Sequence, residues 1–318
     1  MRAAPLVLLI LLASCSVSQP VAKASPSPPA IVTSQTFVPG PPRPSIWVRA
    51  ANGHLEAMSW SGGGPVDIGT GPAIDRGFEF IQSPDGSRLL APGRVVTPAG
   101  DLVGVVPAGK IGWTWADDSR HLCADYNPNR TPGNDSQQPA TIFEVLPGST
   151  PGSIASAGYE AAQNSATVLA CSFGKGTVTA VENCVIVACE VWTFDLASHA
   201  QLYHGTASGP AAASRDGAVF AIGTEVRAAR DGSPISQMSG APVGFGFDGV
   251  LAAIGSRVVD VRSGRVVWTA PGGAAVTSLL GEPFGSRVAV ALGSPGEIWV
   301  VGPDGSSSRI AQGVRPLF

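Results

Sequence analysis

Charged residues are scarce in this chain of 318 residues. Asp, Glu, Lys and Arg together make up 14% of the sequence, only three residues are lysines, and the formal net charge is −3. Proteins that bind nucleic acid through its phosphates carry a basic stripe, and none is visible along this sequence. The composition therefore argues against a nucleic-acid partner.

Helix-forming segments are lacking as well. No stretch of ten or more residues combines apolar positions three and four apart with an absence of Gly and Pro. The chain instead contains 40 glycines and 28 prolines, with Val, Ile, Thr and Trp spread evenly along it. After the N-terminal region, about 270 residues remain, which suits one large all-β domain.

Motifs of the common catalytic sites are absent. The sequence has no Gly-x-Ser-x-Gly elbow, no His-Glu-x-x-His and no complete phosphate-binding Gly-x-x-x-x-Gly-Lys-Ser/Thr. Ser172 and Lys175 match Ser-x-x-Lys, but that chemistry places both residues on one helix face, and Phe173-Gly174 is expected to end a strand. The scattered histidines are interpreted as buried or solvated side chains. We therefore assign no catalytic residue, no metal ligand and no dissociable cofactor.

Cysteines are few, and none lies in a Cys-x-x-Cys pair, which argues against zinc and thiol-redox chemistry. Four follow Cys15 in the sequence: Cys123, Cys171, Cys184 and Cys189. In an exported chain an even set predicts two disulfides, with three connectivities. If 184–189 is one strand, its two thiols point to opposite faces and cannot pair. If 185–188 form a turn, Cys184 pairs with Cys189 and Cys123 is left with Cys171, the alternative we favour because it would join neighbouring repeats.

The N-terminus has the pattern of a secretory signal. A basic Arg2 precedes an apolar run over 5–12 that is too short to cross a bilayer. The sequence Leu-Ala-Ser-Cys at 12–15 resembles the lipobox of bacterial lipoproteins. This resemblance implies diacylglycerol on the Cys15 thiol, a signal peptide over 1–14, and a chain tethered to the cell membrane on its extracytoplasmic side. The alternative is a chance cysteine in an ordinary cleaved signal.

The segment that follows the lipid-bearing cysteine, 15–45, is rich in Pro and Ser and almost free of charge. Such a segment buries too little apolar area to order itself, and its prolines keep it extended. We expect a disordered linker that lifts the domain at 46–318 off the membrane. The alternative that 31–38 adds one strand to the folded body stays open.

An internal repeat predicts the architecture of that domain. A turn with Asp and Gly followed by an apolar strand recurs, with the Asp position at 85, 117, 164, 216, 248 and 284, where the copy at 163–169 is degenerate. Most copies are followed by a second hairpin, so each repeat supplies the four antiparallel strands of a propeller blade. In these turns Asp accepts a backbone N–H and Gly adopts positive φ, so both are expected to be structural.

Two copies resemble known propeller repeats. Ser-Pro-Asp-Gly-Ser-Arg at 83–88 resembles the WD40-like repeats of the TolB type, and 259–268 resembles the repeat of quinoprotein and BamB-type proteins. Both resemblances imply a β-propeller. Six repeats and an additional hairpin starting at Ile46 favour seven blades, the first completed by the chain ends; six blades is the alternative.

Candidate ligand-binding positions lie in two places. Asp125, Asn127 and Asn129 alternate like the start of a calcium loop, but no glycine or closing glutamate follows at the required places, so a plain surface loop is favoured. Its length still makes it a candidate rim of a binding face. Trp113 and Trp115 share one face of a strand, where they serve either core packing, which we favour, or sugar stacking.

These observations predict a lipid-anchored extracytoplasmic β-propeller that acts as a binding or scaffolding module in the cell envelope. Its expected partners are the membrane, through the lipid, and an envelope protein or wall component. The alternative is a propeller enzyme of quinoprotein or hydrolase type, with a site gathered from several blades at the funnel mouth, since such a site leaves no local motif. A third hypothesis is a sensor or stalk protein that reports on the wall.

Overall fold

The computed structural model describes residues 44–70, 80–106, 113–125, 140–144, 166–182, 189–198, 200–207, 209–293 and 296–318. Contacts divide the chain into two units, Met1–Pro39 and Gly40–Phe318, and every described residue belongs to the second. The described ranges are all-β, as the sequence predicts, apart from one 3-10 turn at Pro271–Gly273. None of the helical segments in these ranges is long and apolar enough to cross a membrane. The signal peptide, Cys15, Cys184, His199 and the linker up to residue 43 lie outside the described residues.

The strands pair in chain order into antiparallel sheets. One sheet comprises β4 (Ile81–Gln82), β5 (Leu89–Ala91), β6 (Arg94–Val96) and β7 (Leu102–Val105). The next has three described strands, β8 (Thr114–Trp115), β9 (His121–Asp125) and β10 (Ala140–Glu144). It is followed by β11 (Ala166–Ser172), β12 (Thr177–Glu182), β13 (Cys189–Asp195) and β14 (Gln201–Ala207). Two further sheets contain β15 (Ala211–Ala213), β16 (Val219–Ile222), β17 (Glu225–Ala228) and β18 (Pro234–Gln237), and β19 (Gly244–Phe245), β20 (Leu251–Ile254), β21 (Arg257–Asp260) and β22 (Val266–Thr269).

The last sheet in the unit combines both ends of the described chain. It comprises β23 (Val276–Gly281), β24 (Val288–Gly293), β25 (Gly296–Val301), β26 (Ser307–Pro316), β1 (Ser45–Arg49), β2 (Leu55–Ser59) and β3 (Val66–Asp67). Strand β26 pairs with β25 over most of its length and then with β1 through Arg315 and Pro316. Leu317 continues this contact, because its N–H donates to the Trp47 carbonyl and its own carbonyl accepts from the Gln82 N–H. The C-terminus thus joins β1 to the sheet that starts with β4.

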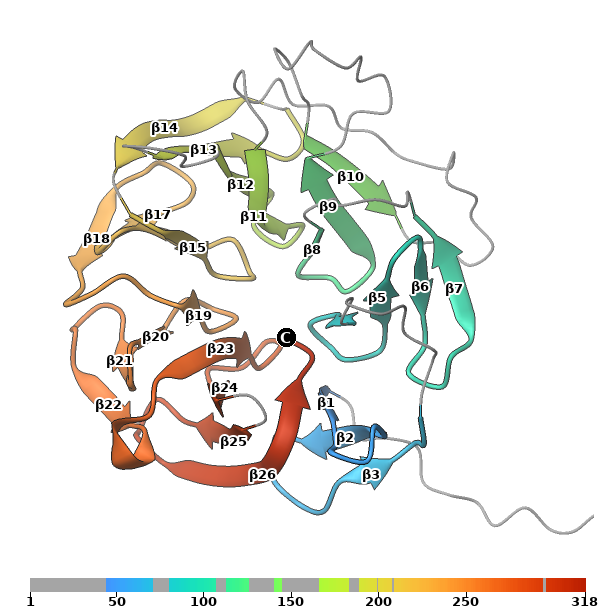
Figure 1. The fold of residues 1–318 in the computed structure, drawn as a ribbon. Helices are drawn as coiled ribbons and strands as arrows, with labels where there is room; N and C mark the ends of the chain where they lie inside the picture. The colour runs from blue at the N-terminus through green and yellow to red at the C-terminus, as the bar shows by residue number, and fades with distance from the viewer. Residues whose placement is uncertain are drawn as a thin grey trace, which may run out of the picture. The chain divides into compact units, whose positions relative to one another are not determined.

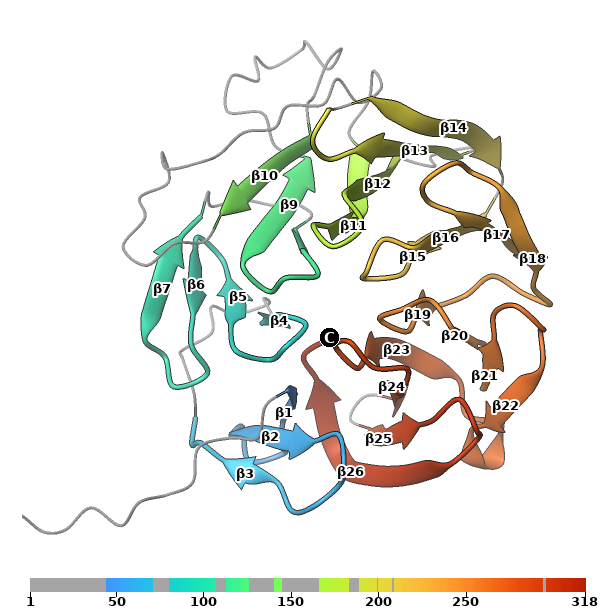
Figure 2. The ribbon, with the colours of Figure 1, turned by 180° about the vertical axis from the view of Figure 1, so that it is seen from behind.

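Within this unit the sheets follow one another around a common centre, with the first strand of each sheet nearest the middle (Figure 1). The view from behind shows the same order (Figure 2). The core lies between neighbouring sheets. All four residues of β20 are buried, because Leu251 and Ala253 pack against the sheet that starts with β23, and Ala252 and Ile254 pack against β16 and β17. Strands buried on both faces explain the continuous apolar runs of the sequence.

The repeated turn connects the first and second strands of each sheet. The carboxylates of Asp85, Asp216 and Asp248 each accept a hydrogen bond from the backbone N–H two residues on, at 2.9, 2.9 and 3.0 Å. The next residue is a glycine with φ of 66 to 71° in these three copies. A Cβ on Gly217 would lie 2.7 Å from the Ser172 Cβ of the preceding sheet, so glycine is needed for both conformation and close approach. The structural interpretation of this Asp-Gly pair is confirmed.

Two details differ from the sequence analysis. The prediction that the degenerate copy at 163–169 contains the turn of its sheet is wrong. Residues 166–172 form the first strand β11, and the corresponding turn follows it at 173–176. Strand β1 begins at Ser45, one residue before the predicted domain start.

Candidate functional site

A cavity of about 230 Å³ lies where the first strands of several sheets converge. We call it the channel site. Its lining is Pro84, Leu169, Ala211, Ala212, Ala213, Arg215, Val243, Gly244, Phe245, Phe247, Leu279, Leu280 and Gly281. These residues come from the turn between β4 and β5 and from the starts of four other sheets, which is why no local motif marks the site. Carbon-rich side chains dominate, and Arg215 is the one charged residue of the lining.

The repeated turns contribute three side chains to the lining of the channel site. The residue just before the Asp position is Pro84 in one sheet, Arg215 in another and Phe247 in a third, and all three line the cavity. The same backbone position therefore carries a side chain toward the cavity in several sheets. Because the turn conformation is fixed by the Asp and Gly that follow, this position can vary without loss of the fold.

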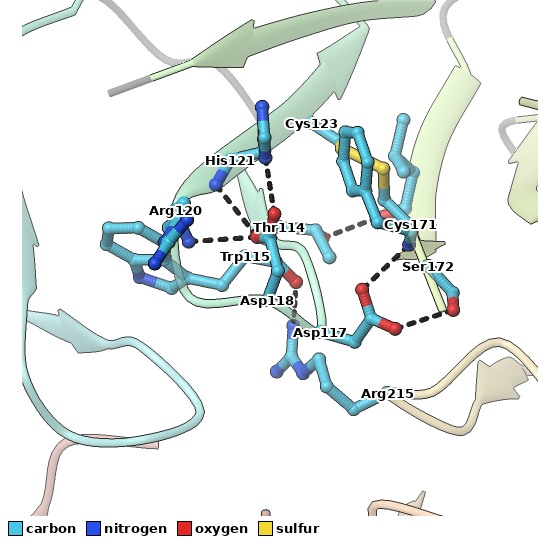
Figure 3. The surroundings of a disulfide bond; sticks show 12 residues. Thr114, Trp115, Asp117, Asp118, Arg120, His121, Cys123, Cys171, Ser172 and Arg215 are labelled. Carbon is cyan, nitrogen blue, oxygen red and sulfur yellow. Dashed lines mark hydrogen bonds and ion pairs between the residues drawn. A yellow bond between two sulfur atoms is a disulfide. The ribbon is translucent and has the colours of Figure 1, made fainter. Parts of the chain in front are cut away.

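The Arg215 guanidinium reaches across to the strand β8. Its Nη1 donates a hydrogen bond to the backbone carbonyl of Trp115 at 3.1 Å (Figure 3). No carboxylate of the described residues forms an ion pair with it. Burial lowers the pKa of Arg215, yet a guanidinium stays charged at any physiological pH. The channel site therefore holds a cation that has one neutral acceptor and no anion.

The carboxylate next in sequence does not neutralise this cation. Asp216 accepts from the Ser214 hydroxyl at 2.8 Å and from the Ala218 N–H at 2.9 Å, within its own turn. Partial burial of its carboxyl group raises the pKa of Asp216. Asp216 thus stabilises the backbone and leaves Arg215 to face the cavity.

A second buried carboxylate, Asp117, occupies the corresponding turn between β8 and β9. It accepts from the Ser172 hydroxyl at 2.7 Å (Figure 3). It also accepts from the backbone N–H groups of Phe173 and Gly174 at 2.7 and 3.0 Å. Three donors from the next sheet satisfy this carboxylate, so it joins two sheets. The Ser172 hydroxyl also accepts from the Lys175 N–H at 2.9 Å, and β11 ends at Ser172. Ser172 and Lys175 thus flank a turn, without the helix that Ser-x-x-Lys chemistry requires.

The described histidines each pair with a carboxylate. His54 contacts Asp67 at 2.8 Å, and His204 contacts Glu190 at 3.3 Å. His121 pairs with Asp118 and stacks on Phe173, with 4.0 Å between ring centroids. Across the described ranges, no three His, Cys, Asp or Glu side chains gather as metal ligands.

The disulfide connects two sheets beside the Asp117 turn. Cys123 on β9 is bonded to Cys171 on β11, both are buried, and their Cα atoms are 6.3 Å apart (Figure 3). This bond is part of the favoured pairing scheme. For Cys189 only the backbone is described, on β13, so the structure gives no second pair.

The two tryptophan candidates do not line the channel site. Trp115 is fully buried and its indole N–H donates to the Ile81 carbonyl at 2.9 Å, while Trp113 is half-buried against the same cluster. Both side chains therefore pack in the core between two sheets. Asp125 is the last residue of β9, and only its backbone is described; Asn127 and Asn129 lie outside the described residues.

Sequence reasoning did not identify Arg215 as a site residue. The available signal was the repeat itself, because position 215 is the one place where a cation stands before the Asp position, while the other copies carry proline, alanine, glutamine or phenylalanine there. Comparing the variable position across copies would have identified it.

Solved structures resemble this chain in fold. The chain matches a prolyl endopeptidase structure with a TM-score of 0.58 and 14% identity, covering 88% of this chain and 50% of that one. TolB from Acinetobacter baumannii matches at a TM-score of 0.41 and 11% identity over 86% of this chain and 65% of that one. The dihydro-heme d1 dehydrogenase NirN matches at 0.47 and 14% over 90% and 68%. No protein-family model and no curated protein matches the chain. The fold of the described unit is a β-propeller, and this chain spans about half the length of the endopeptidase.

Proposed function

We propose that this protein is an extracytoplasmic lipoprotein whose β-propeller acts as a binding module in the cell envelope. Diacylglycerol on Cys15 would anchor it, and the Pro- and Ser-rich linker would hold the propeller away from the membrane. The sequence at 12–15 supports the anchor, and the composition of 15–45 supports the linker. The expected partner is an envelope protein or a wall component.

We also propose that the propeller has seven blades. The pairing of β26 with β1 supports this number, because the C-terminal residues then contribute the inner strand of the blade that β1, β2 and β3 begin. The sheets that start with β4, β8, β11, β15, β19 and β23 would be the other six. Closure by both chain ends matches the expectation for a ring without exposed edges.

The channel site carries the proposal that the module binds its ligand or partner at the centre of the ring. A cation without an anionic partner among the described residues lines this cavity, and the described lining contains no Ser, Thr, Cys, His, Asp, Glu or Lys. A binding site needs the first feature, whereas an acid–base enzyme needs a nucleophile next to a base, which this lining does not supply. The geometry therefore favours binding over the alternative of a propeller enzyme.

Phe284 is an exposed residue next to a side chain that lines the channel site. It lies in the turn between β23 and β24, is 86% exposed, and its ring centroid is 5.2 Å from that of Phe247, which lines the cavity. Leu102 on the outer strand β7 is 61% exposed and offers a matched apolar position at the periphery.

The test is photo-cross-linking in intact cells with a benzophenone amino acid at position 284, and at position 102 as the control. We expect a cross-linked envelope component from Phe284→benzoylphenylalanine and none from Leu102→benzoylphenylalanine. Loss of this product and of acyl labelling in a Cys15→Ser variant would support the anchor. Equal products from both positions, or a product from neither, would contradict a partner at the ring centre.

A further inference from the structure

The channel site has the chemistry of a receptor for one negative charge attached to a small apolar group. Arg215 is the sole charge of the lining, and its Nη1 already donates to the Trp115 carbonyl. That bond orients Nη1 and leaves Nε and Nη2 without an acceptor among the described residues. Two parallel N–H donors on one guanidinium edge match the two oxygens of a carboxylate.

The charge balance favours a monoanion. Arg215 is half-buried and has no anionic partner among the described residues, so a bound anion would compensate its partial desolvation. A phosphate dianion would bring a second negative charge, for which the lining provides no second cation. A neutral ligand would leave the charge of Arg215 as it is. One carboxylate balances the site.

The lining sets the remainder of the ligand. Phe245, Phe247 and Leu279 line the same cavity as Arg215. The cavity has a volume of about 230 Å³, which accommodates a compact apolar group such as one ring or a short alkyl chain. Burial of such a group supplies the hydrophobic share of the binding free energy.

We propose that the channel site binds a carboxylate that carries a compact apolar group, held by the Arg215 guanidinium at one end and by the phenylalanine-lined wall at the other. This inference rests on the proposed function of the propeller as a binding module and specifies its ligand class. A free small acid and the C-terminal carboxylate of a peptide with an apolar last residue share this chemistry.

Calorimetric titration of the purified full chain tests the proposal with pairs of ligands that differ in charge only. The probes are benzoate with benzamide, hexanoate with hexanamide, and acetyl-Gly-Phe with its C-terminal amide. We expect each acid that fits to bind at least tenfold more tightly than its amide. The free acids and the peptide acid form separate arms, so the arm that binds identifies the source of the carboxylate.

Three variants locate the site. Arg215→Gln should abolish the difference between acid and amide. Arg265→Gln is the matched control, because Arg265 is exposed and also donates to a backbone carbonyl, that of Pro303 at 3.4 Å. Val243→Glu adds a competing carboxylate at a lining position that is 45% exposed, so it should suppress acid binding without loss of the fold. Thermal unfolding of each variant verifies that it is folded.

Equal binding of acid and amide, binding of no acid, or full acid binding by Arg215→Gln would each overturn the carboxylate proposal. A cross-link at position 284 together with no acid binding would leave the binding module in place and refute the ligand class alone. Acid binding without a cross-link would support the ligand class and refute an envelope partner at the ring centre.

Discussion

Removal of the Cys123–Cys171 bond should destabilise the propeller by a calculable amount. The bond joins β9 to β11 across two sheets and closes a loop of 48 residues. A cross-link of that span removes about 4 kcal/mol of chain entropy from the unfolded state. With an unfolding entropy of about 2.1 cal/mol/K per residue over roughly 270 residues, this corresponds to a decrease of about 7 °C in Tm. Both sulfur atoms are buried, so Cys123→Ala with Cys171→Ala is the least disruptive substitution.

Thermal unfolding by circular dichroism, with and without dithiothreitol, measures this effect. The second candidate pair is controlled by a Cys184→Ala, Cys189→Ala variant, in which the 123–171 bond is the remaining bond of the folded domain. Dithiothreitol should lower the Tm of that variant by about 7 °C. It should leave unchanged the Tm of a variant in which all four cysteines are replaced by alanine. The reasoning is refuted if the two variants respond alike, or if peptide mapping finds Cys123 as a free thiol under non-reducing conditions.

Three further substitutions test other parts of the structure. Leu317→Ala should destabilise the fold by about 3 kcal/mol in urea unfolding, because Leu317 is buried and joins β1 to the β4 sheet; a loss below about 1 kcal/mol would contradict closure by the C-terminus. Asp118→Asn should cost about 1 kcal/mol at pH 7. Burial opposes ionisation of Asp118, but hydrogen bonds from the His121 side chain and from two backbone N–H groups prevail and lower its pKa below the usual 3.8. The stability that Asp118 contributes is therefore present above pH 3.8 and lost as the pH falls through the lowered pKa. A variant whose loss of stability persists at lower pH would refute this. Phe284→Asn should stabilise the protein by about 0.5 kcal/mol, because Phe284 has φ of 58° and asparagine tolerates that conformation better; a lower Tm would show that the Phe247 contact outweighs the strain.

Local chemistry explains why much of the fold could be predicted. The Asp-Gly turns are determined by a carboxylate that accepts from its own backbone and by a residue that adopts positive φ, and both act within four residues. The apolar strand that follows the turn was equally readable, and in β20 all four residues are buried. The misplaced copy at 163–169 shows the limit, because Phe173–Gly176 forms the turn of that sheet without an Asp, so the repeat pattern did not identify it although a strand end was expected at 173–174.

The site depends on long-range geometry, which explains why it escaped sequence reasoning. Arg215 and Trp115 are 100 residues apart, and their contact exists only because the sheets converge on one centre. Trp113 and Trp115 were expected to share one face of a strand, with core packing favoured over sugar stacking, and the adjacent sheet packs against Trp115. Periodicity predicts which side chains share a face, and only the assembled ring decides which of them meet a cavity.

A crystal structure of the protein soaked with benzoate tests the central claim most directly. The account predicts density for a carboxylate within hydrogen-bond distance of the Arg215 guanidinium, about 2.8 Å, with its ring against Phe245 or Phe247. An Arg215 side chain paired with a carboxylate of the protein itself, with no benzoate in the channel site, would contradict it.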